Sequence, residues 1–239
     1  MRGVDQNITG IGTLADPVRQ ELYLFVCAQP GPVSRDQAAE AIGIARHKAK
    51  FHLDRLESEG LLEAVYARLT GRTGPGAGRS SKLYRRAARE FAVSLPSRDY
   101  LLAGRLMADA IAESAGTGAP VLEVLRRVAA EHGAAIGGGA VSAEGRPTTP
   151  QAALDLAVGA LSEHGYEPRR ESTRVIMANC PFHALAEAQR ELVCHMNHAL
   201  ITGLVESVAP PKVEARLEPG DNRCCVSLAM EGQMGGRSG

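Results

Sequence analysis

The chain has 239 residues, of which 44% are hydrophobic and 23% charged, and its formal net charge at pH 7 is +0. This length is enough for one large or two modest domains with buried cores. No apolar run approaches the roughly 18–20 residues of a membrane-spanning helix, and the N-terminus lacks the apolar segment of a signal peptide. We therefore expect a cytoplasmic protein with no membrane partner, whose cysteines stay reduced.

The neutral total hides a basic N-terminal part. Residues 1–90 hold 14 Lys and Arg against 10 Asp and Glu, and residues 64–89 hold seven basic residues and no acidic one. Overall neutrality therefore does not exclude a polyanionic partner for this part of the chain.

Two short helices joined by a glycine turn are predicted after a first helix over 17–28. Ser34 and Gln37 have the spacing of a capping box, in which each side chain bonds a free N–H group at the start of a helix. Gly43 interrupts this helix, and a second helix is expected over 45–59. This is the helix-turn-helix pattern.

The second of these helices is expected to turn Phe51, Leu53 and Leu56 toward the core. Its first turns also carry a basic cluster, at the end of the helix that enters the major groove in this motif. The candidate DNA-contacting residues of this cluster are Arg46, His47, Lys48 and Lys50.

A basic hairpin is predicted directly after the two helices. Residues 61–86 have the pattern of strand, Gly-rich loop and strand, and a helix-turn-helix followed by such a hairpin is a winged helix. Arg72, Arg79 and Lys82 are the candidate wing residues for contact with phosphates or the minor groove. The loop lacks the ending of a P-loop, so a nucleotide site is not expected there.

Three segments of the N-terminal part resemble winged-helix bacterial transcriptional regulators of the ArsR-like type. They are LADPVRQELYLFV, VSRDQAAEAIGIARHKAKFHLDRLESEGLL and GRTGPGAGRSSKLYRR. The resemblance implies a winged helix-turn-helix domain over residues 12–95 and a homodimer that binds a palindromic double-stranded DNA operator.

The middle of the chain, residues 96–148, is expected to form a helical dimerisation region and a flexible linker. An apolar stripe predicts a helix over 97–113, which in winged-helix regulators commonly makes the dimer contact. Residues 135–149 are rich in glycine and polar residues and are interpreted as a linker or mobile loop.

Residues 149–230 are predicted to form an α+β sensor domain, which makes the whole chain α+β. Thr149 is a candidate N-cap, with Pro150 at the first helical position. A strand pair, a long helix from residue 183 and two closing strands are expected to follow.

Four of the five cysteines fall in this last domain. Cys224 and Cys225 are expected on the final strand, where adjacent side chains point to opposite faces, so only one of them should face a given site. Thiolate and imidazole ligands suit an iron–sulfur cluster or Zn, and buried cysteines without any metal are the alternative. The candidate metal ligands are Cys180, His183, Cys194, Cys224 and Cys225, with His195 and His198 as weaker donors.

The motifs NCPFHALA, LVC and RCC resemble the C-terminal part of iron–sulfur-sensing repressors that control cluster-assembly operons. The resemblance implies an iron–sulfur cluster held by Cys180, Cys194 and Cys224, with Cys225 as the alternative for the last ligand. The doubled last thiol and His183 depart from the pattern of these repressors.

The first hypothesis is therefore a DNA-binding transcriptional regulator that senses a cluster, a metal or redox state through its cysteines. The alternative is a winged-helix regulator of a small organic effector, with structural cysteines. The Cys180–Pro181 dipeptide also resembles a heme-regulatory motif. A Cys180 nucleophile with His183 lacks a definite acidic partner, so an enzyme is not expected.

Overall fold

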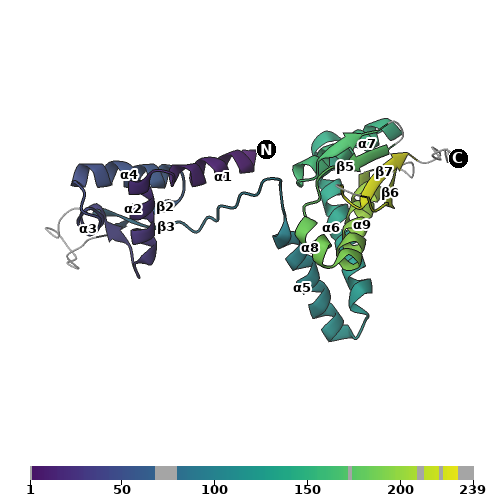
Figure 1. Ribbon diagram of the computed structural model, residues 1–239, viewed down its shortest axis with the longest axis horizontal. Coiled ribbons are helices and arrows are strands. Elements are labelled where there is room, and N and C mark those ends of the chain that lie inside the picture. The colour runs from purple at the N-terminus through teal and green to yellow at the C-terminus, as the bar shows by residue number, and fades with distance from the viewer. Residues whose placement is uncertain (1, 68–79, 172–173, 209–212, 221–222, 231–239) are drawn as a thin grey trace. The chain divides into compact units, whose positions relative to one another are not determined.

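The computed structural model describes residues 2–67, 80–171, 174–208, 213–220 and 223–230. The chain is α+β and divides into two compact units, Met1–Val93 and Ser94–Gly239 (Figure 1). The helices of the predicted middle region thus belong to the second unit.

The first unit contains the predicted pair of helices and the hairpin. Its elements are α1 (Arg2–Thr13), α2 (Pro17–Ala28), β1 (Val33–Ser34), α3 (Arg35–Ala41), α4 (Arg46–Ser58), β2 (Leu62–Ala67) and β3 (Ser81–Arg86). The antiparallel sheet has the order β1-β3-β2, and β2 pairs with β3 along its full length. The core between helices and sheet includes Leu22, Leu53, Leu56, Leu62 and Tyr84.

The capping box at the start of α3 is confirmed. The Gln37 N–H donates to Ser34 Oγ over 3.2 Å, and the Ser34 N–H donates to Gln37 Oε1 over 2.9 Å. Gly43 has φ +70°, a conformation that favours glycine, and it makes the turn between α3 and α4. The local signals that predict the helix-turn-helix therefore correspond to real contacts.

Helix α1 (Arg2–Thr13) begins before residue 12, the predicted start of the DNA-binding domain, and ends just after it. The Asn7 Nδ2 group donates to the Ala92 carbonyl oxygen over 3.0 Å, and Gly10 lies against the Phe91 ring. The first helix is thus attached to the segment that follows the hairpin. The sequence does not predict this helix, because the segment contains three glycines and lacks a polar capping signal.

The second unit packs helices beside a four-stranded antiparallel sheet of order β4-β5-β7-β6. Helices α6 and α9 lie side by side (Figure 1), and α9 also contacts β6 and β7. Thr149 caps α7 with Pro150 at its first position, as predicted. The elements are α5 (Tyr100–Thr117), α6 (Val121–Glu144), α7 (Pro150–Glu163), β4 (Pro168–Arg170), β5 (Arg174–Met177), α8 (His183–Ala188), α9 (Arg190–Val208), β6 (Val213–Leu217) and β7 (Val226–Met230).

The predicted linker over 135–149 is wrong for its first ten residues, which belong to α6. Several glycines around this segment are contact points between helices. A Cβ on Gly133 would lie 2.7 Å from the Leu200 carbonyl carbon, and one on Gly203 would lie 2.7 Å from the Ala130 carbonyl carbon. The backbones of α6 and α9 meet there, so glycine provides close approach instead of flexibility.

Gly133→Ala should destabilise the protein, because a methyl group would be forced into the α9 backbone. We expect a loss of about 2 kcal/mol or more in the free energy of unfolding. Gly138 is the matched control on the same helix, since a Cβ there would meet nothing within 4 Å. Gly138→Ala should stabilise by about 0.5–1 kcal/mol. Urea unfolding followed by circular dichroism measures both, and equal effects would contradict the close contact.

Candidate nucleic-acid interface and thiol cavity

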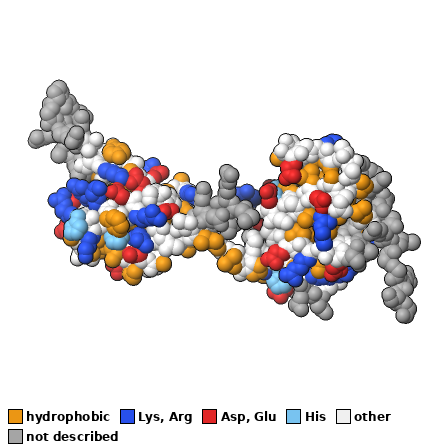
Figure 2. Space-filling model, turned by 90° about the horizontal axis from the view of Figure 1, so that it is seen from above, with side chains coloured by type: hydrophobic (Ala, Val, Ile, Leu, Met, Phe, Trp, Pro, Cys, Tyr) orange, Lys and Arg blue, Asp and Glu red, His pale blue; other side chains and the backbone are white. Residues whose placement is uncertain are grey.

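The first turns of α4 present the predicted basic residues on an exposed surface. Ala49, Leu53 and Leu56 are buried and attach the opposite side of the helix to the core. The exposed side carries Arg46, His47, Lys48 and Lys50. Lysine, arginine and histidine side chains gather on the first unit, as Figure 2 shows.

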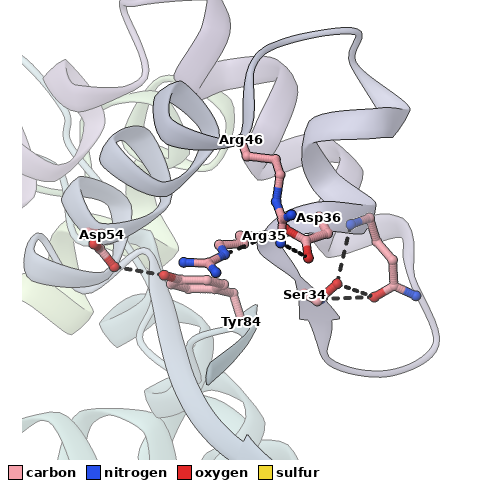
Figure 3. Close-up of polar contacts among 7 residues, drawn as sticks. Ser34, Arg35, Asp36, Arg46, Asp54 and Tyr84 are labelled. Atoms are coloured by element: carbon pink, nitrogen blue, oxygen red, sulfur yellow. Dashed lines mark hydrogen bonds and ion pairs between the residues drawn. The ribbon is translucent and has the colours of Figure 1, made fainter. Parts of the chain in front are cut away.

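These basic residues differ in how they are held. Arg46 is fixed by Asp36 through two bonds, one of them 2.6 Å from Nε to Oδ1 (Figure 3). Lys50 lies 3.2 Å from the Asp54 carboxylate. His47 and Lys48 make no hydrogen bond or ion pair with any described residue. These two basic residues would therefore break no contact with a described residue on meeting a phosphate or a base.

Lys82 has internal partners. Its Nζ donates to Asp54 Oδ1 over 2.8 Å and also bonds Glu57, so β3 is attached to α4. The Tyr84 hydroxyl donates to the same Asp54 oxygen over 2.7 Å (Figure 3). The predicted contact of Lys82 with DNA stays a prediction. In this structure the Lys82 side chain holds α4 in position. The other wing candidates, Arg72 and Arg79, lie outside the described residues.

This cluster changes the acidity of its carboxylate. Burial acts to raise the pKa of Asp54, but hydrogen bonds from Lys82, Tyr84 and Lys50 outweigh burial and lower the pKa to about 2. Asp54 therefore stays ionised and keeps the hairpin and α4 together at any pH near neutrality.

The expected inward position of Phe51 is wrong, because its side chain is 66% exposed. The buried positions of α4 are 49, 53 and 56, and residue 51 falls on the face shared with His47. The Phe51 ring also meets His52 edge to face, with centroids 5.2 Å apart. Its apolar character predicts a core position, but its place on the helix puts it on the exposed side with His47.

All four C-terminal cysteines line one cavity of about 480 Å³ in the second unit. Cys180 lies between β5 and α8, and Cys194 lies in the second turn of α9. The other walls come from α8, from the start of α9 and from the segment before β7. The lining residues are Cys180, His183, Ala186, Glu187, Arg190, Cys194, Pro219, Gly220, Arg223, Cys224 and Cys225.

The expectation that Cys224 and Cys225 lie on a strand and face opposite ways is wrong. Strand β7 begins only at Val226, and both cysteines lie in the bend before it. The Cys224 N–H donates to the Met177 carbonyl oxygen over 2.8 Å, which fixes this bend against the end of β5. Strand alternation does not apply to a bend, so both thiols reach the same cavity.

Neighbouring thiols influence one another there. Hydrogen bonding with Cys224 and burial raise the pKa of Cys180. For Cys224, the bond from Cys180 lowers the pKa, but Cys225 and burial together raise it to about 12. Burial also raises the pKa of Cys194, although its hydrogen bond with Cys225 acts the other way. Cys180, Cys194 and Cys224 are thus neutral near pH 7, and a metal centre would have to displace their protons.

Polar groups also approach the thiols. Asn197 Nδ2 donates to Cys224 Sγ over 3.1 Å, and its oxygen accepts a bond from the Tyr166 hydroxyl. Arg190 and Arg223 line the cavity, and Arg223 Nη1 is buried without a hydrogen-bond partner among the described residues. The cavity therefore combines thiols with positive charge.

The candidate histidines are placed less favourably for binding a metal than the cysteines. His183 lies at the cavity, but its side chain is 55% exposed and pairs with Glu187 at 3.3 Å. His198 bonds the Ala215 carbonyl oxygen, and His195 lines a different cavity. Within the described ranges, no three His, Cys, Asp or Glu side chains are arranged to hold a single metal ion.

The loop that carries Cys180 is attached to the first residues of the second unit. Asn179 Nδ2 donates to the Ser97 carbonyl oxygen over 2.9 Å, and Arg98 bonds both the Asn179 side chain and the Cys180 carbonyl oxygen. The Asp99 N–H donates to the Pro181 carbonyl oxygen over 3.0 Å. Sequence reasoning missed this contact, because Asn179 and Arg98 stand 81 residues apart without any motif that pairs them.

Comparison with known proteins identifies the N-terminal motif. Residues 14–65, from before α2 into β2, match the protein-family model described as a helix-turn-helix domain. No curated protein and no solved structure matches the chain. None of the described helices has the length and apolar character needed to cross a membrane. The match and the exposed basic start of α4 support a DNA-binding transcription regulator with an N-terminal helix-turn-helix domain.

The low pKa of Asp54 predicts a pH-dependent contribution to stability. A carboxylate whose pKa is lower in the folded state stabilises it above the unfolded pKa of about 3.9. The stabilisation by Asp54 relative to Asp54→Asn should therefore shrink as the pH falls from about 4 to about 2. Urea unfolding across this range measures the difference. Asp109→Asn, at an exposed site on α5, is the control, and a pH-independent difference for Asp54→Asn would contradict the ion-pair cluster.

Proposed function

We propose that this transcription regulator senses an iron–sulfur cluster, and through it redox state, in the thiol cavity of its second unit. The observation that supports the proposal most is the position of Cys180, Cys194, Cys224 and Cys225 around one cavity. Four cysteines from three separate segments line this cavity, although Cys180 and Cys225 lie 45 positions apart in the sequence.

The donor set fits a cluster better than a single ion. Iron–sulfur clusters are held by cysteine thiolates, commonly four. A cluster places iron and sulfide between its thiolates, so the ligands need not converge on one point. Zinc requires four donors around a single centre, and the described residues show no such group. Cys180, Cys194 and Cys224 would hold the cluster, with Cys225 as the fourth thiol. The cluster would supply one-electron redox chemistry and sensitivity to oxygen.

The surroundings of the thiols favour an anionic centre. Arg190 and Arg223 outnumber the one carboxylate among the described residues of the cavity wall, Glu187, and Asn197 offers an N–H to Cys224. Charge and hydrogen bonds around thiolates are the features by which a protein tunes such a centre. His183 remains a candidate donor at the exposed edge.

We propose that residues 97–99 are the route by which the cavity influences DNA binding. These residues follow the division between the units and bond directly to Asn179, Cys180 and Pro181. Any shift of Cys180 on binding or losing a centre would move the start of α5. The protein would then bind DNA with different affinities when the cavity is filled and when it is empty. A switch that is controlled by a ligand requires such a difference.

We also propose that the regulator acts as a homodimer through α5. Leu101, Gly104, Ala108, Ile111 and Ala115 are exposed and recur at the alternating spacing of three and four residues that helix pairs use. A second copy of α5 would cover this stripe.

A small organic effector remains the second candidate. A separate cavity of about 390 Å³ lies between the start of α6 and the first turns of α9. It combines apolar Leu122, Leu125 and Met196 with polar Arg126 and His195. Such a mixture suits an organic molecule with a polar group.

Protein purified without oxygen should contain iron and acid-labile sulfide and absorb visible light. Cys194→Ser should lose most of both elements, because it removes one of the thiols at the cavity. Cys27→Ser is the matched control, since Cys27 lies on α2 in the other unit. Cys224→Ser and Cys225→Ser should each lose iron and sulfide as well, and retention of both elements in Cys225→Ser would show that Cys225 is not a ligand. Folded wild-type protein without iron, or with zinc alone, would contradict the cluster.

The route through residues 97–99 predicts that Arg98→Ala uncouples the cavity from DNA binding. The ratio of DNA dissociation constants between cluster-free and cluster-containing protein should fall toward one, from the roughly 5–150-fold typical of coupled sites. Iron content and the affinity of the cluster-free form should change little. Arg105→Ala, on the exposed side of α5, should keep the ratio of wild type. An unchanged ratio in Arg98→Ala would refute this route.

A further inference from the structure

Phe51 is a large apolar side chain that the packing of the first unit does not explain. It is 66% exposed, while Ala49, Leu53 and Leu56 already fill the buried side of α4. Exposed apolar side chains are common singly, so exposure alone carries little weight. The residues beside Phe51 indicate what its ring could contact.

Phe51 lies one turn from two basic residues that pair with no described residue. His47 is four positions before it and Lys48 three positions before it, so the three side chains adjoin on one face of the helix. The carboxylates of α4 at Asp54 and Glu57 are both occupied by Lys82. The face around Phe51 therefore offers a positive charge and an aromatic ring with no unpaired carboxylate of α4 nearby.

This combination matches one edge in duplex DNA. In the major groove each base presents hydrogen-bonding atoms, and thymine alone adds a methyl group. A phenylalanine ring has no hydrogen-bonding group, so the only feature it can select is that methyl. Lys48 and His47 beside it can contact phosphates or base edges. These contacts would place the ring in the groove.

We propose that Phe51 is a specificity-determining residue that contacts the C5-methyl group of a thymine in the operator. The proposal rests on DNA binding through α4, and it adds which base this position selects. A protein partner or a second copy of the chain on the same ring is the competing explanation, and the test below separates it.

The test uses duplexes selected from a randomised library by the full-length wild-type protein. Each thymine of the selected duplex is then replaced by deoxyuridine, which removes only the methyl group. At one or two positions in each half-site, binding should weaken about fourfold, the effect of withdrawing one buried methyl. Phe51→Ala should bind the unmodified duplex more weakly and lose its response to deoxyuridine at those positions alone.

Two control variants separate base reading from general binding. Lys48→Ala should weaken binding yet keep the deoxyuridine response. Leu24→Ala, another exposed apolar position of the first unit, should behave as wild type. Circular dichroism checks that each variant is folded.

Three results would overturn the proposal. The first is the absence of any thymine whose methyl matters, and the second is an equal deoxyuridine response in wild type and Phe51→Ala. If Phe51→Ala instead alters only self-association, the ring belongs to a protein interface. Failure of the wild-type protein to select any duplex would refute DNA binding itself, which is a distinct outcome.

Discussion

The close contact of α6 with α9 is the constraint on which the second unit depends. Gly133 and Gly203 let the two backbones touch, so α9 can neither slide nor rotate without a clash. Helix α9 carries Cys194 and Asn197, and it also packs against β6 and β7. The same contact therefore determines where one cavity thiol lies and where the side chain that bonds Cys224 lies.

In the first unit, ion pairs position α4, as the glycine contact positions α9 in the second unit. Asp36 pairs with Arg46 and so fixes α4 against α3, and Asp54 and Glu57 pair with Lys82 and so fix α4 against β3. Lys50 pairs with Asp54 within α4 itself. Most of the positive charge near α4 is thus committed to the fold. Exposed ion pairs contribute little stability, so their main effect is on the position of the helix. On the described part of α4, the surface around Phe51, with His47 and Lys48, is the part that these ion pairs leave open to a partner.

Local signals could be predicted from the sequence, whereas long-range contacts could not. The capping box at Ser34, the turn at Gly43 and the cap at Thr149 each depend on neighbouring residues, and all three are confirmed. The glycines of α6 resemble a linker unless α9 is known to lie against them. The gathering of four cysteines in the last domain predicts a shared site, and the resemblance adds Cys180, Cys194 and Cys224 as its ligands. That Cys224 and Cys225 share a cavity depends on where β7 starts, which composition does not reveal.

We propose that the occupancy and redox state of the thiol cavity control the affinity of the protein for DNA. The most direct measurement is the dissociation constant of the full-length protein for its selected duplex, before and after the centre is removed without oxygen. The account predicts two clearly different constants for folded protein. Equal constants, with iron present before removal and absent after it, would contradict a sensor and leave only a helix-turn-helix protein beside an unconnected cavity.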